Sequence, residues 1–268
     1  MQLHYHSYPE QQGESHACSV NPPVIIIPGL FGSTANWRTF AKKLSQNFDV
    51  IVIDQRNHGE SPHAPSHTYP DMVADLLEFI DAKGFEQVVL CGHSMGGKVA
   101  MLFSLLYPER VSRLAVLDIA PIEYEHSHAP YLRALMDIDL STLHSRSDAE
   151  KMLKETIVDT PTRLFLMQSL VGKPGEYRWR LNLPVLLADM PFITGFPVDQ
   201  VAGMKSLVDA AFIIGGNSDY VKQAHISLIE EYFPSVSFTT IEDAGHWLHA
   251  ERPKDVLETL IIFLKNDK

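Results

Sequence analysis

Residues 87–107 read QVVLCGHSMGGKVAMLFSLLY and join a short apolar run to a helical pattern through the pentapeptide GHSMG. The run QVVLC is typical of a buried strand, and the residues after Gly97 are typical of a helix. A serine in a G-x-S-x-G turn between a strand and a helix stands on a sharp bend with its hydroxyl exposed. The glycines two positions away on each side leave room for that bend. The stretch therefore predicts Ser94 as an activated nucleophile.

Short apolar runs and helical patterns alternate on both sides of this stretch. Further apolar runs lie at 24–27, 48–53, 113–118, 209–216 and 236–241, a hairpin is expected from 2–8 and 16–20, and helical patterns lie at 37–47, 69–83, 223–233 and 253–265. Runs of Val, Ile and Leu between helices indicate strands buried on both faces of a parallel sheet. We therefore expect an α/β fold with a mostly parallel central sheet flanked by helices.

The alternation stops after Pro121. The following segment has no clear run of a buried strand, and helical patterns occupy 147–158 and 161–171. We predict a helical cap over residues 122–202, inserted after the sixth strand. The core would then consist of residues 1–121 and 203–268.

Charge and composition narrow the classes of partner. The chain has 268 residues with a formal net charge of −11, which argues against nucleic acid and anionic membrane surfaces as partners. We expect no signal peptide, because the start of the sequence has no charged region followed by an apolar stretch. We expect no membrane helix, because no apolar stretch approaches about 18 residues. Two cysteines indicate no disulfide framework. We expect a cytoplasmic protein with a small-molecule substrate and no obligate protein partner.

The base that activates the nucleophile is expected late in the chain. His246 lies in the segment AGHWLHAERP, between the last predicted strand and the closing helix. The order serine then histidine is typical of this strand–turn–helix nucleophile. His249 is the nearby rival, and we interpret it as a flanking residue. The backbone N–H of Met95, directly after the nucleophile, is expected to donate to the oxyanion that forms during attack.

Six segments resemble the α/β-hydrolase superfamily, and most closely its YbfF-type bacterial esterases and their mitochondrial ABHD-type relatives. They read IIPGLFGS, DQRNHGESP, GHSMGGKVAM, VLDIAPIEY, FIIGGNSDYV and AGHWLHAERP, in that order along the core. The resemblance implies the α/β-hydrolase fold, hydrolysis of carboxylic esters or acyl-CoA thioesters, and no cofactor. The family has a histidine where this chain has Pro28. Because the second oxyanion donor is a backbone N–H, we assign it to Leu30.

The acid that orients the histidine has two candidate positions. The position usual in the superfamily is occupied here by Ser218, with Asp219 one residue further on. The second position known in the fold follows the strand after the nucleophile helix, and Asp118 occupies it. A buried acid needs a partner, and His246 is a natural one. We favour Asp118 as the acid with Ser218 as a hydrogen-bonding helper, and we keep Asp219 as the rival.

Several apolar side chains are candidates for the substrate pocket, with ordinary packing between cap and core as the alternative for each of them. They are Phe31, Trp179, Leu186, Met190, Phe192 and Phe196. No metal site is expected, because the scattered histidines lack companion ligands at zinc spacing.

The nucleophile also limits the type of reaction. A serine at position 94 argues against haloalkane dehalogenases and epoxide hydrolases of the superfamily, which use an aspartate there. A serine esterase or thioesterase is the preferred interpretation. A C–C bond hydrolase or a cofactor-free lyase of the same fold stays open as an alternative. A hydrolase-fold binding protein without turnover is a further alternative, ranked lower because all the machinery is present.

Overall fold

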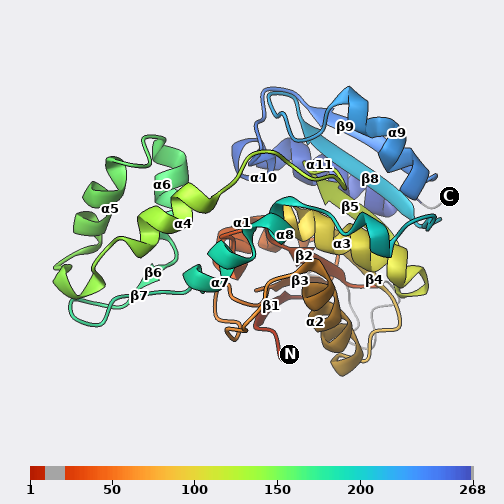
Figure 1. The fold of residues 1–268 in the computed structure, drawn as a ribbon. Helices are drawn as coiled ribbons and strands as arrows, with labels where there is room; N and C mark the ends of the chain where they lie inside the picture. Colours follow the sequence, from red (N-terminus) through yellow and green to blue (C-terminus); the bar gives the residue numbers. More distant parts are fainter. Residues whose placement is uncertain (10–21, 267–268) are drawn as a thin grey trace.

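The computed structural model describes residues 1–9 and 22–266, and its centre is a sheet with helices on both faces (Figure 1). Within these residues the sheet has seven strands. In spatial order they are β1 (Tyr5–Tyr8), β3 (Val50–Ile53), β2 (Val24–Ile27), β4 (Val88–His93), β5 (Val111–Leu117), β8 (Asp209–Gly215) and β9 (Val236–Ile241). Only β1 runs antiparallel to its neighbour in this sheet. The predicted α/β architecture with a mostly parallel sheet is confirmed.

Side chains of the central strands are buried on both faces of the sheet, which explains why their sequences are apolar without alternation. In β2, Ile25 belongs to the apolar cluster that contains α2 and α3, and its neighbour Ile26 belongs to the cluster that contains α1 and α11. The core helices are α1 (Thr34–Leu44), α2 (Tyr69–Ala82), α3 (Met95–Leu106), α9 (Gln223–Tyr232), α10 (Leu248–Glu251) and α11 (Pro253–Lys265). No helix in the described part of the chain is long and apolar enough to cross a membrane.

The predicted N-terminal hairpin is only partly within the described residues. The first predicted run contains β1, which pairs with β3 in the register Tyr5 to Ile53. The second run, at 16–20, lies outside the described residues. Five described strands, β1 to β5, precede the insertion, whereas the sequence predicted six. The difference is the strand expected at 16–20.

The segment between β5 and β8 builds a lobe beside the sheet. Its elements are α4 (Ala129–Met136), α5 (Arg146–Lys154), α6 (Thr160–Met167), β6 (Leu170–Val171), β7 (Arg178–Trp179), α7 (Leu183–Ala188) and α8 (Met190–Thr194). Figure 1 shows α4, α5, α6 and the β6–β7 ribbon standing apart from the sheet, after which α7 and α8 return along the core. The two-stranded ribbon was not expected from the sequence, because each of its strands has only two residues. The division into core and cap at residues 121 and 203 stays a prediction.

Candidate functional site

Ser94 stands on the bend between β4 and α3. Its backbone has φ 52° and ψ −121°, a conformation that non-glycine residues rarely adopt. A Cβ atom added to Gly92 would collide with the Gly96 carbonyl, and one added to Gly96 would collide with the Ile27 carbonyl. The two glycines of the motif are therefore required by the close approach of the backbone at this turn.

His246 lies between Ser94 and Asp118. Its Nε2 atom is 3.0 Å from the Ser94 Oγ atom, and its Nδ1 atom is 2.8 Å from Oδ2 of Asp118. Because an ionised carboxylate only accepts hydrogen bonds, the ring proton lies on Nδ1 and donates to Asp118. Nε2 is then free to accept the hydrogen bond of the Ser94 hydroxyl. The three side chains are thus aligned for moving a proton from Ser94 to His246.

The surroundings of the two acid candidates differ sharply. Asp118 is fully buried, and besides His246 its carboxylate accepts hydrogen bonds from the Gly215 N–H at 3.0 Å and from the Ser218 hydroxyl. The side chain of Asp219 is 97% exposed and lies 3.9 Å from the Lys222 ammonium. Asp118 and Ser218 therefore lie where the sequence predicted an acid and its helper, whereas the Asp219 side chain is exposed to solvent.

Two aromatic neighbours of His246 were missed by sequence reasoning. The Tyr220 ring stacks on the His246 ring with centroids 3.6 Å apart and planes 12° apart. Burial holds the pKa of His93 well below its usual value, so its ring is neutral and its Nε2–H donates to the His246 carbonyl at 2.8 Å. His93 is the residue before Ser94 in the motif, and this position was the only signal in the sequence. The hydrogen bond from His93 joins the loop that carries His246 to the turn that carries Ser94.

The loop after β2 contains the second predicted oxyanion donor. The Gly32 N–H donates to the Gly29 carbonyl and the Phe31 N–H donates to Nε2 of His58, both at 3.0 Å. The Leu30 N–H has no acceptor among the described residues. Met95 is the first residue of α3, where backbone N–H groups have no partner within the helix. Both predicted donors are therefore free to bind an oxyanion.

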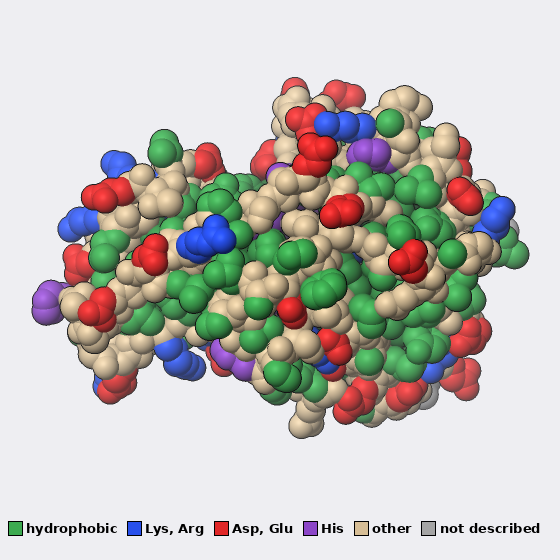
Figure 2. Space-filling view, viewed as in Figure 1, with side chains coloured by type: hydrophobic (Ala, Val, Ile, Leu, Met, Phe, Trp, Pro, Cys, Tyr) green, Lys and Arg blue, Asp and Glu red, His purple; other side chains and the backbone are tan. Residues whose placement is uncertain are grey.

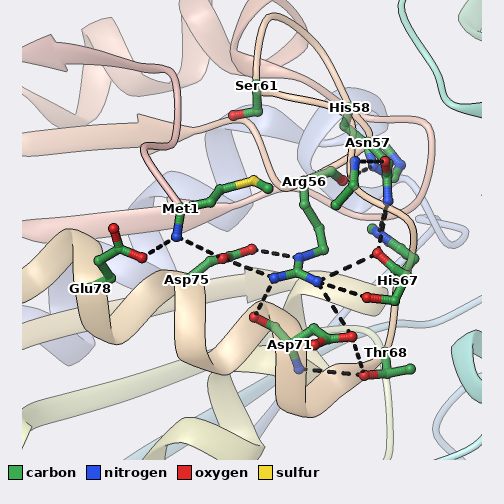
Figure 3. A network of polar contacts seen from close by, with 12 residues as sticks. Met1, Arg56, Asn57, His58, Ser61, His67, Thr68, Asp71, Asp75 and Glu78 are labelled. Carbon is green, nitrogen blue, oxygen red and sulfur yellow. Dashed lines mark hydrogen bonds and ion pairs between the residues drawn. The ribbon is translucent and has the colours of Figure 1, made fainter.

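His58 holds this loop through a network that follows β3 (Figure 3). Arg56 donates from Nε and Nη2 to the two carboxylate oxygens of Asp75, at 2.6 and 2.9 Å. On the same loop, Nδ1–H of His58 donates to the Arg56 carbonyl at 3.0 Å. Burial lowers the pKa of His58 to about 4, so its Nε2 atom carries no proton and accepts from Phe31. His58 was not singled out from the sequence.

Ser94 opens into a cavity of about 370 Å³ between the core and the lobe. Of the six predicted pocket residues, Phe31 lines it. The others do not, which corrects the expectation: Leu186, Met190 and Phe196 are buried in packing, Phe192 is 59% exposed, and Trp179 lies in the β6–β7 ribbon. The lobe contributes side chains from α4 and α6 instead. Tyr131, Phe165 and Leu166 line the cavity from the lobe, and Tyr220 and Trp247 line it from the core.

A groove of about 640 Å³ adjoins the cavity and shares some of its lining residues. Phe165 of α6 and Trp247, which precedes α10, line both, and their ring centroids are 5.7 Å apart. A hydrogen bond between the Asn36 and Gln168 side chains also links α1 to the end of α6. Figure 2 shows a hollow between the lobe and the rest of the molecule on this face. The cavity therefore opens to the outside between α6 and the core.

The residues that the structure describes contain no group of three or more histidine, cysteine or carboxylate side chains placed to hold a metal ion. The polar groups around Ser94 are those of acid–base and hydrogen-bonding chemistry.

Comparisons with known proteins show similarity over most of the chain. Residues 22–253 match the family described as alpha/beta hydrolase fold. The chain is 37% identical to a mouse sn-1-specific diacylglycerol lipase, ABHD11, over 91% of this chain and 81% of the relative. It is 34% identical to the esterase YbfF of Escherichia coli K12, over 92% and 94% of the two chains. The solved structure of a marine microorganism esterase has a TM-score of 0.89 and 37% identity, covering 98% of this chain and 99% of that one.

Proposed function

Since this chain belongs to the alpha/beta hydrolase fold family and is a serine hydrolase of the carboxylesterase type, we propose that it cleaves carboxylic esters through an acyl-enzyme on Ser94. The observation that carries the proposal is the alignment of Ser94, His246 and Asp118 at 3.0 and 2.8 Å. In the same motif, the conformation of Ser94 presents its hydroxyl to the cavity.

In the acylation half of the reaction, Oγ of Ser94 attacks the ester carbonyl carbon while its proton moves to Nε2 of His246. The carbonyl π electrons move onto oxygen, and the backbone N–H groups of Leu30 and Met95 stabilise this oxyanion. When the tetrahedral intermediate collapses, the bond to the alkoxy oxygen breaks and His246 gives its proton to that oxygen. The products are the free alcohol and an ester of Ser94.

In the deacylation half, a water molecule takes the place of the serine hydroxyl. His246 accepts a proton from the water as its oxygen attacks the acyl carbon, and then returns the proton to Oγ of Ser94. The carboxylic acid is released and Ser94 is restored. Asp118 keeps the ring proton on Nδ1 throughout and stabilises the imidazolium that forms in each half.

The charges around the cavity favour oxygen esters over acyl-CoA thioesters. The side chains lining the cavity and the groove include the carboxylates of Glu251 and Asp159 and no lysine or arginine. The phosphates of coenzyme A would meet no cation along this path. We therefore propose an uncharged small-molecule ester as substrate. Cytoplasmic localisation stays a prediction from the sequence.

The test of the proposal is the hydrolysis of p-nitrophenyl acyl esters by the wild type and by the Ser94→Ala variant. Turnover that vanishes in Ser94→Ala, and persists in the exposed control Ser237→Ala on β9, would support a serine esterase. Reaction of Ser94 with a fluorophosphonate without ester turnover would favour a C–C bond hydrolase or a lyase. If the protein shows neither ester turnover nor labelling of Ser94, a binding protein would be favoured.

A further inference from the structure

Ser94 lies between two cavities of very different size. Besides the cavity of about 370 Å³, it lines an inner pocket of about 30 Å³. Leu30 lines both of them, whereas Met95 lines only the inner pocket. The proposed oxyanion donors thus stand beside Ser94 on the side of the inner pocket. An ester bound at Ser94 has two arms, and the two spaces are available for one arm each.

The position of His246 decides which arm enters which space. His246 lines the large cavity and is not among the residues lining the inner pocket. The general acid must reach the alkoxy oxygen to protonate it as it leaves, so the alcohol lies on the side of His246. The acyl chain extends from the other side of the reacting carbon. This geometry directs the alcohol into the large cavity and the acyl chain into the inner pocket.

The inner pocket has room for only a very short chain. A volume of about 15 Å³ on this scale holds one water molecule, so about 30 Å³ holds about two groups of that size. The methyl group of an acetyl ester or the ethyl group of a propionyl ester fits this space. A medium or long acyl chain does not fit unless the walls move.

Hydrogen bonds hold the walls of the inner pocket in place. The buried Lys98 of α3 donates all three of its ammonium hydrogens to backbone carbonyls, at 2.7 Å from Ile122, 2.8 Å from Thr194 and 2.6 Å from Gly195. Lys98 therefore binds both ends of the lobe segment to the nucleophile helix. With no hydrogen left to donate, it is a wall of the pocket rather than a group that binds substrate.

Two tyrosines strengthen the same walls. The Tyr69 hydroxyl donates to the Ile193 carbonyl at 2.7 Å. The Tyr124 hydroxyl accepts from the Ala120 N–H at 2.9 Å and donates to the Tyr220 carbonyl at 2.7 Å. Enlarging the pocket would break several of these buried hydrogen bonds, each of which is costly to leave unmade.

We infer that the protein selects esters of short acids with large apolar alcohols, with the acyl group in the inner pocket and the alcohol in the cavity lined by Tyr131, Phe165 and Trp247. This inference rests on the proposed serine esterase function and names its class of substrate. The inner pocket limits acyl length, and the outer cavity with its groove accepts length on the alcohol side.

A pair of isomeric esters tests the inference. Octyl acetate and ethyl octanoate have the same atoms, with the long chain on opposite sides of the ester. We expect kcat/KM to be about tenfold or more higher for octyl acetate, the discrimination that one or more misplaced methylene groups produce. Equal values, or a preference for ethyl octanoate, would overturn the inference while leaving a serine esterase in place. No Ser94-dependent turnover of either ester would overturn the inference and the proposed function together.

A wall variant with a matched control provides the second test. Ile193 is buried and lines the inner pocket, and its bond to Tyr69 is made by its backbone, so Ile193→Ala enlarges the pocket without removing that bond. We expect the ratio of p-nitrophenyl butyrate to acetate turnover to rise by about tenfold. Phe192→Ala, the exposed neighbour on α8 that lines neither space, should leave the ratio unchanged. An unchanged ratio in a folded Ile193→Ala protein would overturn the inference.

Discussion

Asp118 leaves β5 with φ 51°, a left-handed conformation, and its carboxylate faces His246. A buried carboxylate is costly unless its lone pairs are satisfied. Here three donors satisfy it, from His246, Gly215 and Ser218. Ser218 occupies the position where the superfamily usually has the acid, and its hydroxyl donates a hydrogen bond to Asp118. The two positions therefore contribute to one hydrogen-bonding group.

Replacing the acid should separate the two candidates. We expect Asp118→Asn to lower kcat for p-nitrophenyl acetate by about a thousandfold or more, because an amide no longer fixes the histidine tautomer or stabilises the imidazolium. Asp219→Asn, at a fully solvated side chain, should stay within about twofold of the wild type. The measurement is the steady-state kinetics of both variants. Loss of activity in Asp219→Asn with an active Asp118→Asn would reverse the assignment.

His58 is expected to act as a positioning residue for the oxyanion loop. Its neutral Nε2 atom accepts the Phe31 N–H, next to the Leu30 donor. His58→Phe leaves that N–H without an acceptor, and we expect kcat to fall about tenfold to a hundredfold with little change in KM, since the oxyanion forms only in the transition state. His58→Gln, whose side-chain oxygen can accept the bond, should recover part of the loss. Equal losses in both variants, or a change confined to KM, would contradict this role.

At the scale of the elements, α6 lies between the large cavity beside Ser94 and the groove that adjoins it. Phe165 of α6 contacts Trp247 across the boundary between the two. Phe165→Ala should join the two spaces, so that acetates of longer alcohols gain kcat/KM relative to short ones by about tenfold. Leu164→Ala provides the control on the same helix, because Leu164 is half exposed and lines only the groove. An unchanged alcohol preference in Phe165→Ala would show that this contact is not a boundary for substrate.

The elements differ in how well the sequence predicts them. The strands β2 and β9 were predicted residue for residue. In β2 all four residues are buried, which requires a continuous apolar run. In contrast, β9 is a largely exposed edge strand whose signal is its content of β-branched residues. In the lobe, helices α5 and α6 lie within a few residues of their predicted ranges. The side chains that reach Ser94 could not be predicted there. Which face of α6 or α8 meets the core depends on how the lobe packs, and no periodicity in one helix records that.

The candidate site, too, could be predicted from the sequence only in part. Ser94, His246 and Asp118 were predictable because each follows a core strand, and the carboxyl ends of parallel strands gather at one edge of the sheet. His58 and Tyr220 were not, because they act through loops whose backbone path brings them to the oxyanion loop and to His246. Phe192 was predicted in the pocket and is exposed. An aromatic residue in the lobe can pack against its neighbours or contact substrate, and the surrounding sequence does not distinguish the two roles.

At the scale of the whole molecule, buried histidines make stability depend on pH. Burial lowers the pKa of His58 and His128 from 6.5 to about 4 and that of His249 to about 3, and lowers those of His67 and His93 well below the usual value. These side chains are neutral when folded and take up protons on unfolding. Below pH 6.5 the unfolded chain therefore binds more protons than the folded protein. The free energy of unfolding consequently falls as the pH falls.

We expect the free energy of unfolding to fall steeply as the pH drops from about 6.5 towards 4, the range over which these histidines take up protons only in the unfolded chain. A shift of His58 from 6.5 to about 4 alone contributes about 3 kcal/mol over that range, a large part of the stability of an ordinary domain. Urea unfolding at several pH values measures the effect. His58→Gln should reduce the slope between pH 6.5 and 4, and a stability independent of pH over that range would contradict the account.

The acyl-enzyme on Ser94 is the central claim, and mass spectrometry after rapid acid quenching tests it most directly. The protein is mixed with excess p-nitrophenyl acetate, quenched during turnover and digested. The account predicts one acetyl group on the peptide that contains Ser94, released with time in the wild type and absent in Ser94→Ala. Hydrolysis with no acetyl group on that peptide, or with the same acetylation in Ser94→Ala, would contradict it.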